Sequence, residues 1–439
     1  MLHPVSERTS RYSWYVLAVL LCVYSVNWMD RYVLIILLEP IKRDLKLSDT
    51  ALGLLSGFVF ATIYSLAGIP IARLADRSVR RTVIATGLAV WSVMTTLSGL
   101  AASFAQLVAA RFGVALGESA CSPAASSLIA DYFPAERRAT AFAIYGVGIT
   151  IGMALGLAVG GWANELYGWR AAFFVAGLPG LALALVLRLT VREPIRGQAE
   201  PVAMDHAQYS ATQTVRTILS CKSFLAYTVG LGLFSFSGNA FETWTPVYLI
   251  RAYHLGTGAL GSWLGSLEAV SGLIGTVAGG LVADRLGRRD PRWYLWMPAT
   301  AAAMMVPLMF AFLHTRGGVM YLFYFLTTIC SSSYMAPMVA ITQQIMPVRL
   351  RALATALLYL LLNLIGPGAG PFVAGLLSDR FAPTYGVQGL RLSLTVTLLG
   401  AVCGVVLTLW GARALPEDLL RVGRAAGIPS PKARAAEAQ

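Results

Sequence analysis

Residues 280–289 read GLVADRLGRR and follow directly on a long apolar run. A shorter copy, DRSVRR at residues 76–81, also follows an apolar run, and its Asp-Arg pair lies 208 residues before Asp284 and Arg285. A second junction, PAERRA at residues 134–139, is similar to PVRLRA at residues 347–352. Because both pairs repeat at nearly the same spacing, the sequence predicts two halves with the same topology.

Apolar runs long enough to cross a membrane make up most of the chain. Hydrophobic residues are 57% of the 439 and charged residues only 13%, and the mean hydropathy is +0.66. This composition is too apolar for one soluble core, and a membrane helix needs about 20 mostly apolar residues. Twelve runs qualify: 14–38, 50–73, 82–103, 107–130, 138–163, 171–190, 224–250, 258–282, 293–313, 318–342, 349–377 and 388–413.

The predicted fold is therefore an all-α membrane protein of twelve transmembrane helices in two six-helix bundles. We expect an N-terminal bundle at 1–192, a polar linker at 193–222, a C-terminal bundle at 223–413 and a tail at 414–439. The net charge of +13 is explained by Arg-rich loops on one side rather than by nucleic-acid binding. The positive-inside rule places both termini and those loops in the cytoplasm, in a plasma (inner) membrane protein.

Six charged residues fall inside the predicted helices, where each costs about 2.5–3.5 kcal/mol at the membrane centre on insertion scales. They are Asp30, Arg31, Arg111, Glu118, Glu242 and Glu268. Such residues are paired, face an internal cavity, or both. Asp30 is expected to meet Arg111 across a cavity, which leaves Arg31 for Glu118 or for a substrate anion. The alternative is an ion-pair network that only holds helices together.

Proton coupling is the function predicted for the acidic members of this group. A carboxyl in an apolar helix beside arginines can bind and release a proton as its surroundings change. Glu118 is the first candidate and Asp30 the second. Other polar residues could line the cavity. For the asparagines, hydrogen bonding between helices is an equally good interpretation, and for Glu242 the alternative is a position at the membrane interface. This set is Asn27, Asn239, Glu242, Glu268 and Asn363.

The Asp-Arg loops and the junction after helix 4 are predicted to form a gate at the cytoplasmic helix ends, where ion pairs and contacts to helix carbonyls would close the inner side. A role in setting topology alone is the alternative. The residues are Asp76, Arg77, Arg80, Arg81, Arg138, Asp284, Arg285, Arg288 and Arg289.

The motifs resemble those of a known family. Residues 280–289 match the G-x-x-x-D-R-x-G-R-R signature of the major facilitator superfamily, whereas the first copy has Ala72 and Val79 where glycines are expected. Within that superfamily, NWMDR at 27–31 and Arg111 with GES at 117–119 resemble the motifs of the Spinster family. This resemblance implies transport of lysophospholipids or sphingolipid-like molecules, often coupled to protons.

Other functions fit the sequence less well. A transporter of a small organic anion or drug-like compound would keep the same fold and charges. An enzyme is not expected, since the chain has no HExxH or P-loop motif. A sensor or scaffold would not need coupling carboxylates. The five cysteines form no CxxC pair, so no metal site or cofactor is predicted. The expected partners are the substrate, protons and membrane lipids, with no nucleic acid, and the chain is expected to be a monomer.

Overall fold

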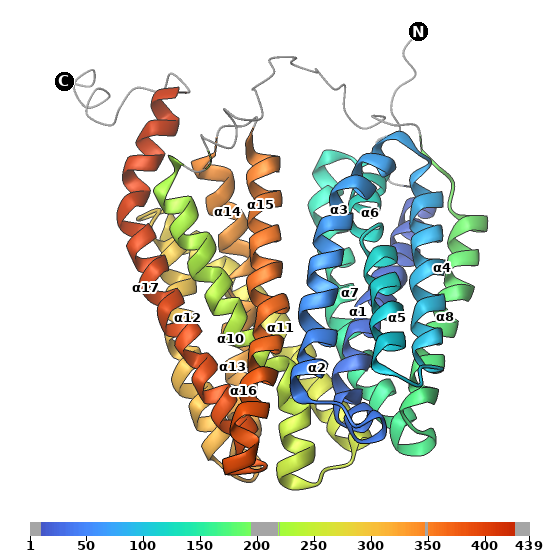
Figure 1. The fold of residues 1–439 in the computed structure, drawn as a ribbon. Coiled ribbons are helices and arrows are strands. Elements are labelled where there is room, and N and C mark those ends of the chain that lie inside the picture. The colour runs from blue at the N-terminus through green and yellow to red at the C-terminus, as the bar shows by residue number, and fades with distance from the viewer. Residues whose placement is uncertain (1–9, 195–217, 219, 347–349, 426–439) are drawn as a thin grey trace, which may run out of the picture. The chain divides into compact units, whose positions relative to one another are not determined.

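The computed structural model describes residues 10–194, 218, 220–346 and 350–425 (Figure 1). All regular structure within these ranges is helical. The chain divides into two compact units. Unit 1 comprises 1–205, 243–269 and 385–388, and unit 2 comprises 206–242, 270–384 and 389–439.

The first half of the chain supplies six membrane crossings, two of which are built from more than one helical segment. The segments are α1 (Arg11–Leu45), α2 (Asp49–Gly53), η1 (Leu54–Phe58), α3 (Val59–Arg77), α4 (Arg80–Ser98), α5 (Phe104–Glu118), α6 (Cys121–Tyr132), α7 (Ala135–Tyr167) and α8 (Trp169–Thr190).

The second half also supplies six crossings, of which the fourth and the fifth are built from more than one segment. Its segments are α10 (Lys222–Tyr253), α11 (Thr257–Gly287), α12 (Trp293–His314), α13 (Gly318–Ser332), α14 (Met335–Ile345), α15 (Arg351–Asn363), η3 (Leu364–Ala369), α16 (Gly370–Tyr385) and α17 (Gln388–Ala425). The fourth crossing of each half is broken at its centre, between α5 and α6 and between α13 and α14. The predicted twelve-helix fold is thus confirmed.

Length and hydropathy alone identify ten of these crossings as able to span a membrane. The remaining two are α4 and the α5–α6 pair. In the latter, neither α5, with 15 residues, nor α6, with 12, reaches the length that a bilayer requires. The expected linker and tail fall largely on residues 195–217, 219 and 426–439, outside the described ranges.

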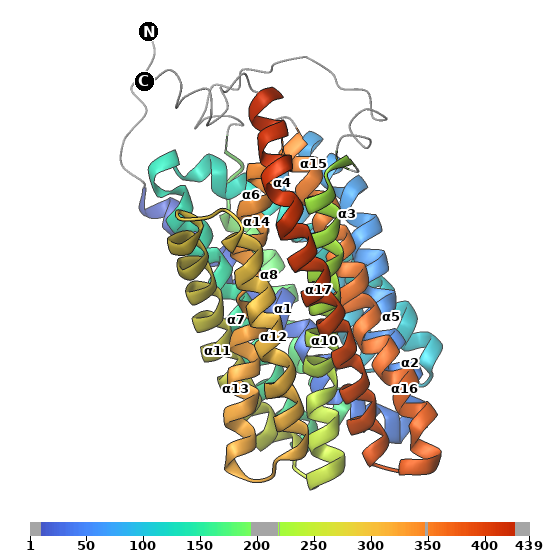
Figure 2. The same cartoon turned by 90° about the vertical axis from the view of Figure 1, so that its left-hand side faces the viewer.

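Each unit has an apolar core of its own. In unit 1 the core gathers side chains between Val16 and Val191, and in unit 2 between Ile218 and Leu415. Within unit 2, α12 and α13 run side by side (Figure 2). Many of the largest exposed side chains are also apolar, including Leu189 at 72% and Leu281 at 66%. An apolar outer surface of this kind is expected where lipid replaces water as the solvent.

Helices α1 and α7 pack closely against each other in unit 1. A Cβ atom on Gly152 would lie 2.3 Å from the Ser25 carbonyl oxygen, and one on Gly156 would lie 2.6 Å from that of Met29. Only glycine permits this approach, because any side chain would force the helices apart. The four-residue glycine spacing of α7 therefore packs this helix against the part of α1 that carries Asp30 and Arg31.

Candidate substrate and proton site

Two acidic and two basic side chains lie in the interior of unit 1. Asp30 and Arg31 come from the middle of α1, and Arg111 and Glu118 come from α5. Asp30, Arg111 and Glu118 are buried, whereas the Arg31 side chain is 21% exposed. The structure thus brings together all four residues that were predicted to carry substrate and proton coupling.

Arg31 and Glu118 form the direct ion pair of this group. Arg31 donates from both Nε and Nη2 to Glu118 Oε2, each at 2.7 Å. The expectation that Arg31 answers Glu118 is therefore confirmed. The other oxygen, Oε1, is buried and has no hydrogen-bond partner among the described residues. A buried acceptor without a partner is costly, so this oxygen is a natural place for a proton.

Arg31 is also enclosed by aromatic rings. Its guanidinium carbon lies 4.9 Å from the Trp28 ring centroid, 4.7 Å from that of Phe60 and 4.9 Å from that of Tyr64. Cation–π attraction at these distances holds the charge in place and keeps it partly desolvated. Arg31 is therefore fixed by three rings and one carboxylate.

The expected pair between Asp30 and Arg111 is wrong. Asp30 Oδ2 instead accepts a hydrogen bond of 2.5 Å from Thr95 of α4, and Oδ1 has no partner in the described part of the chain. Arg111 forms no ion pair among the described residues, and its guanidinium carbon lies 5.1 Å from the Phe60 ring. The physical reason is that α4 supplies a hydroxyl at the position facing Asp30.

The break in the fourth crossing follows from the sequence around Glu118. This residue ends α5, and the Ser119 hydroxyl donates to the Leu116 carbonyl at 2.7 Å. A Cβ atom on Gly117 would lie 2.7 Å from the Gly87 carbonyl oxygen, so this glycine lets α5 touch α4. Close packing and the helix end together hold Glu118 in the interior.

The other predicted polar residues are spread over both units. Asn27 is buried one turn before Arg31 and is a close neighbour of Glu118. In unit 2, Asn239 donates to the carbonyl and hydroxyl oxygens of Ser235, at 2.9 and 3.0 Å, within its own helix. Glu268 is buried, while Glu242 and Asn363 are half-buried. Their part in a cavity stays a prediction.

Three residues of the predicted gate hold unit 1 together internally. The buried Arg80 binds Asp131 at 2.5 Å and Glu193 at 2.7 Å, which joins the start of α4 to α6 and to the segment after α8. Arg81 donates to the Val191 carbonyl at 2.8 Å, and Arg138 to that of Ala130 at 3.1 Å. These contacts give the arginines a packing role beyond any gating.

The remaining gate residues are exposed: Asp76, Arg77, Asp284, Arg285, Arg288 and Arg289. Asp284 accepts a hydrogen bond of 3.1 Å from the Tyr294 hydroxyl within unit 2. Their role as a gate stays a prediction.

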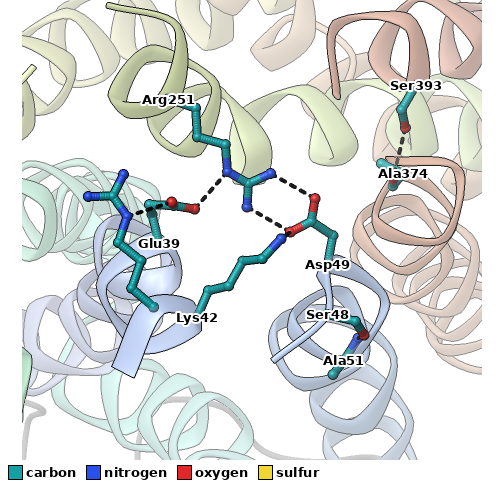
Figure 3. Close-up of polar contacts among 9 residues, drawn as sticks. Glu39, Lys42, Ser48, Asp49, Ala51, Arg251, Ala374 and Ser393 are labelled. Atoms are coloured by element: carbon teal, nitrogen blue, oxygen red, sulfur yellow. Dashed lines mark hydrogen bonds and ion pairs between the residues drawn. The ribbon is translucent and has the colours of Figure 1, made fainter. Parts of the chain in front are cut away.

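At the far end of α1, a buried ion-pair cluster joins α1, α2 and α10 (Figure 3). Arg251 donates to Asp49 from Nη1 and Nη2, each at 2.7 Å, and to Glu39 from Nε, also at 2.7 Å. Lys42 binds Asp49 at 2.5 Å, and Arg43 binds Glu39 at 2.9 Å. Two carboxylates are thus shared by three cations, which we call the Arg251 cluster.

A second polar contact lies where α11 begins, also within unit 1. Glu165 of α7 accepts a hydrogen bond of 2.6 Å from the Gly258 amide, and Asn164 donates to Thr257 at 2.9 Å. A carboxylate at a helix N-terminus accepts hydrogen bonds from amides that have no partner within the helix, and its negative charge interacts favourably with the helix dipole. Together with the Arg251 cluster, this contact ties residues 243–269 to the rest of unit 1.

Sequence reasoning missed Thr95 and the Arg251 cluster. A threonine in a membrane helix gives no signal by itself, because most threonines there bond to their own helix. Glu39, Asp49 and Arg251 each lie one residue outside a predicted span. Hydropathy therefore places them in loops, although Glu39 is 5% and Asp49 2% exposed.

Comparison with known proteins agrees with this architecture. The family model described as Major Facilitator Superfamily matches residues 20–371 and 257–434. The chain belongs to the major facilitator superfamily. Its members named below are transporters, and this superfamily protein is a multi-pass integral membrane protein.

Several curated relatives cover most of the chain. An "MFS-type efflux pump" of Mycolicibacterium smegmatis is 34% identical over 399 residues, covering 90% of this chain and 92% of the relative. Human "Protein spinster homolog 1" is 27% identical and covers 91% and 79%. The "Sphingosine-1-phosphate transporter" of Danio rerio is 26% identical and covers 88% and 80%.

A solved structure described as a bacterial homolog of the human lysosomal transporter Spinster, inward-facing and unoccupied, has a TM-score of 0.85 at 29% identity. It covers 93% of this chain and 98% of the solved one. This superfamily member therefore resembles the Spinster family in sequence and in fold.

Proposed function

We propose that this protein is a proton-coupled secondary transporter that moves an amphiphilic lipid with an anionic headgroup, such as a lysophospholipid or sphingolipid-like molecule. The observation that carries the proposal is the group of Asp30, Arg31, Arg111 and Glu118 in the interior of unit 1, of which all but Arg31 are buried. Buried charges are expensive in a membrane helix and are kept where they act on a substrate or a proton. The sphingosine-1-phosphate transporter and the Spinster proteins among its relatives support a lipid substrate.

Arg111 is the residue that would hold the anionic headgroup. Arg31 is already bound by Glu118 and enclosed by three aromatic rings. Arg111 forms no ion pair among the described residues, and its Nε has no hydrogen-bond partner there, although its guanidinium lies beside the Phe60 ring. A guanidinium can bind phosphate through two parallel hydrogen bonds, a geometry that a lysine lacks.

Glu118 would couple this binding to a proton. When a proton binds at Oε1, the carboxyl loses the negative charge that holds Arg31. Arg31 is then released to share the headgroup charge with Arg111, so that proton and anion binding support each other. Asp30, whose Oδ1 also has no partner in the described residues, is the second proton site.

Alternating access would let the site face each side of the membrane in turn. We place both termini in the cytoplasm of an inner-membrane protein, with bundles at 1–192 and 223–413 joined by the linker 193–222. The exposed Asp-Arg loops would form the cytoplasmic gate. The Arg251 cluster would then lie at the outer end and would have to open when the site faces outward.

The experiment that tests this proposal is flux of a lysophospholipid in proteoliposomes, with and without an imposed pH gradient. Glu118→Gln should lose the dependence on the gradient, because an amide cannot exchange a proton. The matched control is Glu136→Gln, since Glu136 is exposed at the start of α7. Gradient-dependent flux that persists unchanged in Glu118→Gln would refute this coupling site.

A small organic anion or a drug-like compound is the second candidate substrate. The efflux pump of Mycolicibacterium smegmatis, at 34% identity, favours it. The same charged group could bind either substrate, and the acyl chain of a lipid is the part that differs. Absence of lysophospholipid flux under both conditions, with saturable flux of a small aromatic carboxylate, would replace the lipid by this class.

A further inference from the structure

Thr95 makes a hydrogen bond that is unusual for its position in a helix. Serine and threonine hydroxyls in helices commonly donate to a carbonyl three or four residues earlier. Thr96 does so on the same helix, to the Ser92 carbonyl at 2.8 Å, and Ser98 does so to that of Met94 at 3.0 Å. Thr95 instead donates across helices to Asp30 Oδ2 at 2.5 Å.

Close packing on two sides fixes α4, and with it the Thr95 hydroxyl. On one side, a Cβ atom on Gly117 of α5 would lie 2.8 Å from the Trp91 amide nitrogen. On the other, a Cβ atom on Gly177 of α8 would lie 2.3 Å from the Thr96 hydroxyl, and one on Gly180 would lie 2.1 Å from that of Ser92. Contacts this tight leave α4 little freedom to turn or slide.

The Thr95 hydroxyl makes the two carboxylate oxygens of Asp30 chemically different. Oδ2 is occupied by Thr95, while Oδ1 is buried without a partner among the described residues. The charged groups that face Asp30 are Glu118 and Arg111 from α5 and Arg31 from its own helix. A proton arriving at Asp30 therefore binds at Oδ1, and the hydroxyl stabilises the ionised form.

We propose that Thr95 is a positioning residue that holds Asp30 for proton exchange, by donating to Oδ2 and leaving Oδ1 as the oxygen that takes the proton. The consequence for transport rests on the proposed proton coupling. The consequence for the ionisation of Asp30 does not, and it can be measured without a substrate.

The direct test is an infrared titration of the purified protein, in which the Asp30 carboxyl band is the signal that Asp30→Asn removes. Thr95→Val keeps the side-chain shape and removes the donor, so ionised Asp30 is less stable. The titration midpoint should rise by about one to two pH units, the worth of a hydrogen bond to a charged group. Thr95→Ser keeps the hydroxyl and should restore the midpoint.

Thr96→Val is the matched control, because its hydroxyl bonds only to its own helix among the described residues. Its midpoint should equal that of the unchanged protein. A midpoint in Thr95→Val equal to that of Thr96→Val would overturn the proposal. So would an Asp30 band that does not titrate over the range in which the unchanged protein stays folded.

Transport provides a second readout. The pH profile of lysophosphatidylglycerol flux in proteoliposomes should move upward in Thr95→Val and return in Thr95→Ser. If the unchanged protein shows no flux while the infrared midpoint still shifts, the proposed substrate fails and the role of Thr95 stands. If flux is coupled to protons and the midpoints are equal, the role of Thr95 fails and the proposed function stands.

Discussion

Neutralising Arg251 is the change that most directly tests the Arg251 cluster. In Arg251→Met the side chain keeps much of its length but loses three hydrogen bonds, two to Asp49 and one to Glu39. Both carboxylates are at least nine-tenths buried and would be left with less compensation. We expect residues 243–269 to separate from α1 and α2 more often.

The expected free-energy cost of Arg251→Met follows from the burial of the cluster. Removing one partner of a buried ion pair costs about 3–5 kcal/mol. Lys42 still binds Asp49 and Arg43 still binds Glu39, so we expect a smaller cost of about 2–3 kcal/mol for Arg251→Met. This corresponds to an increase of about 30- to 150-fold in the population of the separated state.

The matched control is Arg170→Met. Arg170 binds Asp44 at 2.6 Å, but these side chains are 44% and 45% exposed. An exposed ion pair contributes about 0–1 kcal/mol, so the control should change the separated population by less than about fivefold. High salt should weaken the exposed pair much more than the buried cluster.

The assay is the rate of maleimide labelling at Leu264→Cys in detergent. Leu264 is 1% exposed and lies one residue before Gly265, whose Cβ atom would meet the Ala154 carbonyl of α7. A thiol there reacts only when residues 243–269 move away. Equal labelling rates in Arg251→Met and Arg170→Met would refute the reasoning.

The background of this assay is low after two changes. Cys22 and Cys403 are exposed and must be replaced, whereas Cys121, Cys221 and Cys330 are buried. Burial also raises the pKa of the Cys221 thiol to about 11, which keeps it protonated and unreactive.

Two further predictions concern stability. In Gly156→Val, the added side chain would meet the Met29 carbonyl at 2.6 Å, so the melting temperature should fall, while Gly146→Val, with no atom within 4 Å, serves as the control. A fall equal to that of the control would show that α1 and α7 do not depend on this contact. In Arg80→Gln, the half-buried Asp131 and Glu193 lose the cation that they share, and the hydrogen bonds lost to these charged groups should cost about 2–3 kcal/mol. Arg77→Gln at an exposed site should change stability by less than about 1 kcal/mol. Denaturant unfolding of both variants measures the difference, and equal midpoints would contradict it.

The helices of this protein could be predicted because their signal is local. A bilayer demands a long apolar run for each crossing, and no tertiary contact is needed to recognise it. The repeat between Asp76 and Asp284 likewise indicated two halves of one topology. The burial of Asp30, Arg111 and Glu118 also followed, because a charge inside such a run is kept away from lipid by facing the protein interior.

The partners of those charges could not be predicted in the same way. Arg31 and Glu118 were matched correctly, but the hydroxyl of Thr95 took the place expected for Arg111 beside Asp30. Helical spacing gives the face and the depth of a residue, but it does not say which neighbouring helix stands opposite. That choice is made by glycines such as Gly117 and Gly177, which set how closely the helices approach.

The sequence alone therefore determined the twelve crossings, the repeat and the small set of charges kept within the membrane. Only the tertiary structure decided the pairing of Arg31 with Glu118, the contact of Thr95 with Asp30 and the Arg251 cluster. The physical reason is that apolar length is a sum along the chain, whereas an ion pair depends on the rotation and separation of two helices. Those are fixed by packing between segments far apart in sequence.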